Sequence, residues 1–183
     1  MEVILDQLGS HSSTREGRAA ATIDALGPGT FPYLLKALRT HQNAFARAVA
    51  AQCLLRFGGR ARAALLRALR DPAMPVRLTG LLVLDQLWGA KVERSILRLL
   101  RDPRPGIRHN ATRVLARHHA VTAVPQLTRL LNDPVWHVRQ QAARALGILG
   151  AERAVPALWQ AASDPRQAVR NAARDALRRL EAV

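Results

Sequence analysis

Arginine is the residue type that could do most chemistry in this sequence, and the chemistry it suits is the binding of anions. The 183 residues include 28 Lys and Arg against 13 Asp and Glu, which gives a formal net charge of +15, and the lysines are Lys36 and Lys91. A guanidinium group is permanently charged and presents its donors in a planar fork that fits carboxylates and phosphates. An excess of this size attracts nucleic acid, anionic lipid headgroups or acidic proteins.

Residues that could catalyse a reaction or hold a metal are few and badly spaced for it. Cys53 is the only cysteine, and its apolar surroundings in Ala50–Leu55 favour a small core residue over a nucleophile. His118 and His119 are adjacent, so on a helix they would point about 100° apart and could not share a metal ion. We therefore expect no catalytic residue, no metal site, no cofactor and no small-molecule substrate, and we interpret the protein as non-enzymatic.

A repeat organises the arginines. The dipeptide Asp-Pro recurs at a constant spacing of 31 residues, and an arginine stands six residues after each aspartate. The aspartates are Asp71, Asp102, Asp133 and Asp164, and the arginines are Arg77, Arg108, Arg139 and Arg170. In the preceding unit the Asp-Pro is absent, and Arg47 comes one place late. A fixed period in this range is typical of a solenoid built from stacked repeats.

One repeat reads as an antiparallel pair of helices. Residues 124–131 predict a helix opened by Pro125, residues 132–134 a turn in which Asp133 can cap the next helix, and a second helix follows and stops at Gly150. We predict an all-α fold, an α-solenoid or superhelix of about six such units with period 31. The chain is expected to be a single domain, 1–183, with an atypical N-terminal capping repeat at 1–29 and regular repeats at 30–183.

The segments AVPQLTRLLNDPVWHVRQQAARALGILG and AVPALWQAASDPRQAVRNAARDAL resemble the HEAT-repeat superfamily, in particular its short-repeat branch named after the phycobilisome lyases. The resemblance covers essentially residues 30–183. It implies that each turn aspartate and the arginine six residues later form a ladder between neighbouring repeats, with a structural role. It also implies that the second helix of each unit is an inner helix that lines a concave face.

Helical geometry then predicts which inner-helix residues are open to a partner. If Val138, Ala142 and Leu149 mark the buried side, Gln140, Arg144 and Gly147 point away from it. The equivalent positions one repeat earlier include Ala116, and those two repeats earlier include Asp85. The candidate partner-binding residues are His109, Arg113, Arg117, Gln140, Arg144, Asn171, Arg174 and Arg178.

A second periodic set of cations lies on the first helices of the repeats. Its members are Lys36, Arg67, Arg98 and Arg129 in one phase, and Arg39, Arg70 and Arg101 one turn later. Cations in the last turn of a helix interact favourably with its exposed carbonyl groups, and a charged outer face keeps a repeat protein in solution. We interpret this set mainly as a solvated surface.

The remaining features narrow the class of protein. No apolar run approaches the roughly 20 residues of a membrane helix, and the N-terminus lacks the pattern of a secretory signal, so we expect a cytoplasmic protein without a membrane span. The main hypothesis is a binding scaffold that engages an acidic partner protein through its arginine-rich surface.

Two alternatives stay open. One is a nucleic-acid-binding HEAT-like protein, including the alkylpurine DNA glycosylase type, and the other is a subunit similar to phycobilin lyases. A glycosylase site would need an acid and aromatics around an extruded base. Asp85 and Asp175 are the acids predicted on the inner face, and the sequence does not bring Trp88, Trp136 and Trp159 together.

Overall fold

The computed structural model describes residues 27–181, and within them every regular element is a helix. Two compact units divide the chain: the first ends at Val92 and the second begins at Glu93. These findings confirm the predicted all-α fold of the α-solenoid class. The predicted capping repeat at 1–29 falls almost wholly outside the described residues, and the assignment of 1–183 to one domain stays a prediction.

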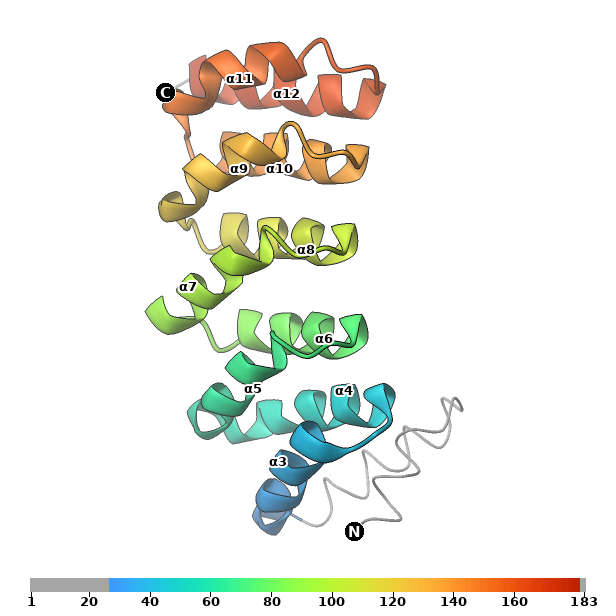
Figure 1. Ribbon diagram of the computed structural model, residues 1–183. Coiled ribbons are helices and arrows are strands. Elements are labelled where there is room, and N and C mark those ends of the chain that lie inside the picture. The colour runs from blue at the N-terminus through green and yellow to red at the C-terminus, as the bar shows by residue number, and fades with distance from the viewer. Residues whose placement is uncertain (1–26, 182–183) are drawn as a thin grey trace. The chain divides into compact units, whose positions relative to one another are not determined.

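The described α-helices pair along the chain as the 31-residue period predicts (Figure 1). Their bounds are α3 (Phe31–Thr40), α4 (Ala44–Cys53), α5 (Arg62–Ala68), α6 (Met74–Asp85), α7 (Ala90–Leu99), α8 (Pro105–Arg117), α9 (Val124–Leu130), α10 (Trp136–Ile148), α11 (Val155–Ala161) and α12 (Gln167–Glu181). Short 3-10 helices are η1 (Gly27–Thr30), η2 (Leu54–Ala61), η3 (Val121–Ala123) and η4 (Glu152–Ala154).

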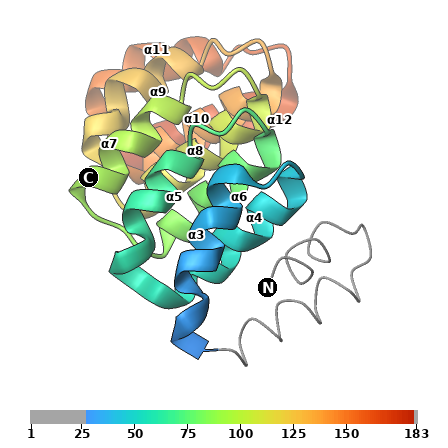
Figure 2. The same cartoon turned by 60° about the horizontal axis from the view of Figure 1, so that its bottom comes forward.

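Each unit has its helices in two layers. In the first unit α4 packs against α6, and α3 and α5 pack against these two helices. In the second unit α8, α10 and α12 lie side by side, and α9 and α11 form the other layer, as Figures 1 and 2 show from two directions. We call α8, α10 and α12 the inner helices of the second unit. Because α10 contacts both α8 and α12, it has neighbours on two sides.

The helix ends follow from local sequence. α9 and α11 begin with a proline in the first turn, where a missing N–H costs no hydrogen bond. After α10, Gly150 takes a φ of 62°, and one period earlier His119 takes a φ of 49° after α8. This left-handed conformation ends a helix and favours glycine. His118 and His119 are therefore turn residues, as predicted.

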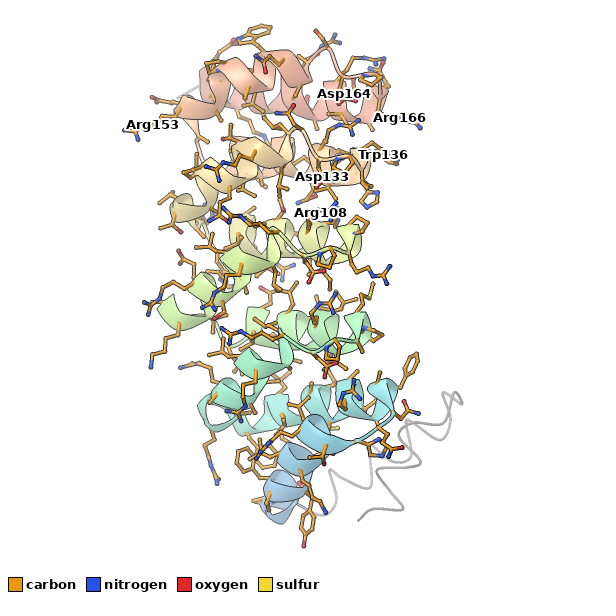
Figure 3. All side chains as sticks on the ribbon, in the orientation of Figure 1. Arg108, Asp133, Trp136, Arg153, Asp164 and Arg166 are labelled. Carbon is orange, nitrogen blue, oxygen red and sulfur yellow. The ribbon has the colours of Figure 1, made fainter. Side chains whose placement is uncertain are left out.

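The turns between paired helices carry the predicted ladder. Arg139 donates from Nε and Nη2 to the carboxylate of Asp164, at 2.7 and 3.0 Å, and from Nη1 to the carbonyl of Asp133 in its own turn at 2.8 Å. Arg108 does the same with the Asp133 carboxylate and the Asp102 carbonyl. Figure 3 labels Arg108 and Asp133 on this side of the second unit. The ladder arginines therefore join consecutive turns, which confirms their structural role.

One detail of the turn differs from expectation. Asp133 does not cap α10, whose N-cap residue is Val135. Instead the Asp133 side chain accepts a hydrogen bond from the Val135 N–H at 2.9 Å, and Asp164 holds the Arg166 N–H in the same way. The aspartate closes its own turn because the proline that follows keeps the chain extended for one residue before the helix begins.

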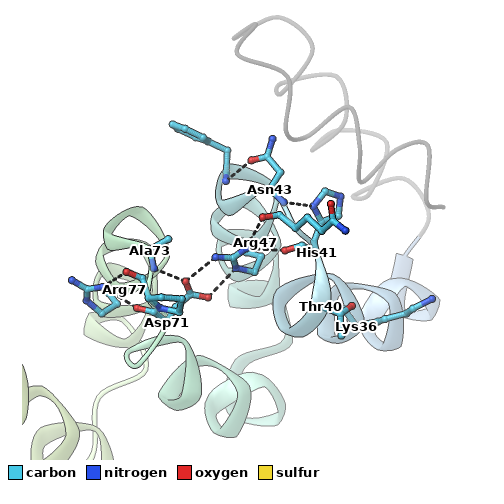
Figure 4. A network of polar contacts seen from close by, with 11 residues as sticks. Lys36, Thr40, His41, Asn43, Arg47, Asp71, Ala73 and Arg77 are labelled. Atoms are coloured by element: carbon cyan, nitrogen blue, oxygen red, sulfur yellow. Dashed lines mark hydrogen bonds and ion pairs between the residues drawn. The ribbon is translucent and has the colours of Figure 1, made fainter.

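The irregular repeat in the first unit keeps the same architecture (Figure 4). Arg47 binds the Asp71 carboxylate through Nε and Nη2, both at 2.9 Å, and its Nη1 donates to the carbonyl of His41 at 2.7 Å. His41 Nδ1 accepts from the Asn43 N–H, which is the bond that Asp71 makes with Ala73 one repeat later. An imidazole thus replaces the turn carboxylate, and the late position of Arg47 matches the late position of this turn.

Candidate functional site

The inner helices α8 and α10 bring together a cluster of basic and polar side chains. His109 lies half-buried on α8, and its Nδ1 is 3.3 Å from the His137 carbonyl oxygen on α10. The two imidazole rings meet edge to face at a centroid distance of 5.8 Å. Because a carbonyl only accepts, this contact places a proton on Nδ1 and leaves Nε2 of the neutral ring as an acceptor.

Two arginines flank this histidine pair. Arg113 follows His109 by one turn on the same face of α8, and Arg144 is the exposed residue one period later on α10. Neither arginine has an ion-pair partner or hydrogen-bond acceptor on another side chain within residues 27–181. By contrast, the ladder arginines Arg108 and Arg139 have carboxylate partners.

The electrostatics of His109 reflect this arrangement. Partial burial lowers the pKa of His109 below 6.5, and the positive charges of His137, Arg113 and Arg144 lower it further, against a hydrogen bond to the His137 carbonyl that raises it. A neutral imidazole therefore stands among positive charges. An anion placed between Arg113 and Arg144 would neutralise part of that field.

The structure also fixes the positions of the other predicted residues. His109, Arg113 and Gln140 are half-buried, and the exposed members are Arg117, Arg144, Asn171, Arg174 and Arg178. Asn171 continues the row of His109 and Gln140 onto α12. We call His109, Arg113, Arg117, Gln140, Arg144 and Asn171, together with His137, the inner-helix face.

Arg174 and Arg178 do not belong to that face. Their equivalents on α10 are Ala143 and Gly147, and both are buried. The same side of α12 is exposed because no further helix within residues 27–181 packs on it. Arg178 pairs with Asp175, which stands one period after Arg144. The positive row therefore ends at α12, where an acid replaces the arginine.

Three residues predicted to be open are buried instead. They are Asp85 on α6, Ala116 on α8 and Gly147 on α10. At Gly147 a Cβ atom would lie 2.8 Å from Cα of Ala176 on α12, so this position is where the two helices approach most closely among those with a glycine. The prediction was wrong because it assumed one buried side, whereas α10 is covered by helices on two sides.

Sequence reasoning missed two exposed residues beside the inner-helix face. Trp136, the first residue of α10, is 40% exposed and contacts the His137 ring edge to face. Figure 3 labels it near Arg166. Ile148 is 42% exposed at the other end of α10. The period gave no signal for His137, because its equivalents are Gly106 and Ala168.

Two further features bear on the other predicted classes. Within the described part of the chain, no helix is long and apolar enough to cross a membrane. The same residues contain no group of three or more His, Cys, Asp or Glu side chains arranged to hold a metal ion. Trp136 and Trp159 are both exposed but lie on different helices, α10 and α11.

Comparison with known proteins identifies the repeat. Residues 92–178 match the family model described as HEAT repeats. No curated protein matches the chain in sequence. The ladder, the helix pairs and the matched residues coincide in the second unit.

Several solved structures share the fold at low sequence identity. YibA from Escherichia coli is 19% identical with a TM-score of 0.76, over 99% of this chain and 72% of its own. A designed armadillo repeat protein in complex with the peptide (KR)4 is 16% identical with a TM-score of 0.66, over 97% and 98%. The complex of CpcE and CpcF of phycocyanin lyase from Nostoc gives 22% identity and a TM-score of 0.57, over 94% and 73%. These similarities establish the fold, and with the family match they show that the chain is a HEAT-repeat protein.

Proposed function

We propose that this protein is a non-enzymatic scaffold that binds an acidic segment of a partner protein along the inner-helix face. The observation that carries the proposal is that Arg113 and Arg144 flank His109 and His137 on neighbouring helices without an acid of their own. Helical-repeat proteins use extended surfaces of this kind to bind other chains.

The side chains beside the arginines favour carboxylates spaced along a peptide. Gln140 and Asn171 can hydrogen-bond a peptide backbone, and each guanidinium can take one carboxylate through two parallel bonds. Asp175 interrupts the positive row at α12. An acid at that point would repel a continuous phosphate backbone but can be avoided by a peptide whose carboxylates are separate.

The sign of the charge supports an acidic partner. The designed armadillo repeat protein was solved with a peptide written as Lys-Arg repeats. The present chain has a formal net charge of +15. A ligand that complements this chain is therefore expected to carry the opposite charge.

The partner class is tested by a pull-down from lysate at low and at moderate salt, with and without nuclease. We expect acidic proteins that survive nuclease and moderate salt. A direct titration then compares a glutamate-rich peptide with an oligonucleotide of equal charge. Recovery of nucleic acid alone, together with oligonucleotide binding whose affinity falls steeply with salt, would replace the protein partner by a phosphate backbone.

A further inference from the structure

A groove in the second unit is lined by three arginines that the proposed function does not use. Its volume is about 420 Å³, and its lining residues are Arg94, Leu97, Arg98, Arg101 and Gln126. Four of these residues belong to α7 and the turn after it, and Gln126 comes from α9. The groove is thus built by the first helices of two consecutive repeats.

The three arginines project from one side of α7. Residues at i, i+4 and i+7 fall within an arc of about 60° on a helix, and Arg94, Arg98 and Arg101 have this spacing. Like charges at such spacings destabilise a helix unless an anion lies between them. None of the lining residues is acidic. Glu93 accepts a hydrogen bond from the Thr122 hydroxyl instead of lining the groove.

The end of the helix does not account for the whole cluster. Favourable interaction with the helix dipole is limited to the last turn, and Arg94 lies in the first half of α7. Arg98 and Arg101 are exposed, and neither has a side-chain partner within residues 27–181. The groove therefore presents three guanidinium groups whose charge is balanced by no acid in its lining.

The chemistry of the lining indicates a doubly phosphorylated ligand. A phosphate group carries about −1.5 to −2 at neutral pH, so two linked phosphates balance three guanidinium groups better than one carboxylate does. Guanidinium forks bind phosphate oxygens in pairs, and the Gln126 amide can donate one more hydrogen bond. We propose that the groove between α7 and α9 binds the pyrophosphate group of a small phosphorylated molecule.

The experiment is a calorimetric titration of the full chain with inorganic pyrophosphate. We expect saturable binding that weakens at least tenfold in each of Arg98→Gln and Arg101→Gln. Gln126→Ala should also weaken it, although this change leaves the net charge as it was. Arg67 and Arg70 occupy the same positions one repeat earlier, so the double variant Arg67→Gln/Arg70→Gln is the matched control and should bind like the native protein.

Three outcomes would overturn the site. They are no saturable binding of pyrophosphate, equal losses in the control and in the groove variants, and no effect of Gln126→Ala. The double variant Arg113→Gln/Arg144→Gln separates this site from the inner-helix face. It should keep its affinity for pyrophosphate, and loss of that affinity would move the phosphate site to α8 and α10.

Discussion

Arginines five residues apart on α10 have opposite environments. All three side-chain nitrogens of Arg139 donate hydrogen bonds, to Asp164 and to two turn carbonyls. The Arg139 and Asp164 side chains are only 14% and 8% exposed. Arg144 is exposed and has no such partners. One residue type therefore holds the repeats together at one position and is available to a ligand at the other.

Replacing these two arginines should separate the roles. Arg139→Ala leaves the Asp164 carboxylate without its partner, and we expect the free energy of unfolding to fall by about 2 kcal/mol or more. Arg144→Ala should change it by no more than about 0.5 kcal/mol, as at other exposed positions. Urea unfolding measures both values. A larger loss from Arg144→Ala would reverse the assignment of structural and exposed arginines.

The same ion pair predicts a dependence on acid. The hydrogen bond from Arg139 lowers the pKa of Asp164 below 3.8, against burial, which raises it. The stabilisation is complete above the unfolded-state pKa and is lost as the pH falls through the lower folded-state pKa. Asp164→Asn should therefore destabilise the protein strongly at about pH 7 and less at about pH 3. The exposed residue Asp175 provides the control Asp175→Asn, and an equal pH dependence in both variants would contradict the argument.

At the scale of elements, the decisive contact is the close approach of α10 and α12. Gly147 lets the helices meet where a Cβ would lie 2.8 Å from Cα of Ala176 and 2.9 Å from its Cβ. The first of these atoms is backbone, so the clash can be relieved only if the helices move apart. Glycine is needed here for space rather than for backbone conformation.

Gly147→Ala should therefore destabilise the second unit. Overpacking of this kind costs about 1–3 kcal/mol, and the better helix propensity of alanine returns up to about 1 kcal/mol. We expect a net loss of about 1 kcal/mol in urea unfolding. Gly59→Ala is the control, because a Cβ there meets no atom within 4 Å. A Gly147→Ala protein as stable as the native chain would show that α10 and α12 separate freely.

The sequence predicted the helix pairs, the turns and the ladder because all three depend on contacts that recur with the period. It also marked Arg47 as displaced, and the structure shows that His41 shifts the turn with it. The burial of Ala116 and Gly147 could not be predicted from one apolar stripe, since neighbours on both sides widen the buried arc of an inner helix. His137 was missed because it contributes a backbone carbonyl and a ring that no other repeat has.

At the scale of the whole molecule, the ladder leaves most of the positive charge unused. Its arginines are neutralised by the turn aspartates, whereas those of the inner-helix face and of the α7–α9 groove have no acid among their own lining residues. A net charge of +15 by itself gives weak, unspecific attraction to any polyanion. The account requires more, namely that affinity depends on where the charges lie.

The most direct test is to move the same amount of charge at two places and measure the affinity for a glutamate-rich peptide. Arg113→Glu/Arg144→Glu reverses the inner-helix face, and Arg67→Glu/Arg129→Glu reverses two cations of the first helices with the same change in net charge. We predict that the first variant loses at least tenfold in affinity, about 1.4 kcal/mol, and that the second stays within a few-fold of the native protein. Equal losses would mean diffuse attraction without a site, and a larger loss from Arg67→Glu/Arg129→Glu would place the partner on the first helices instead.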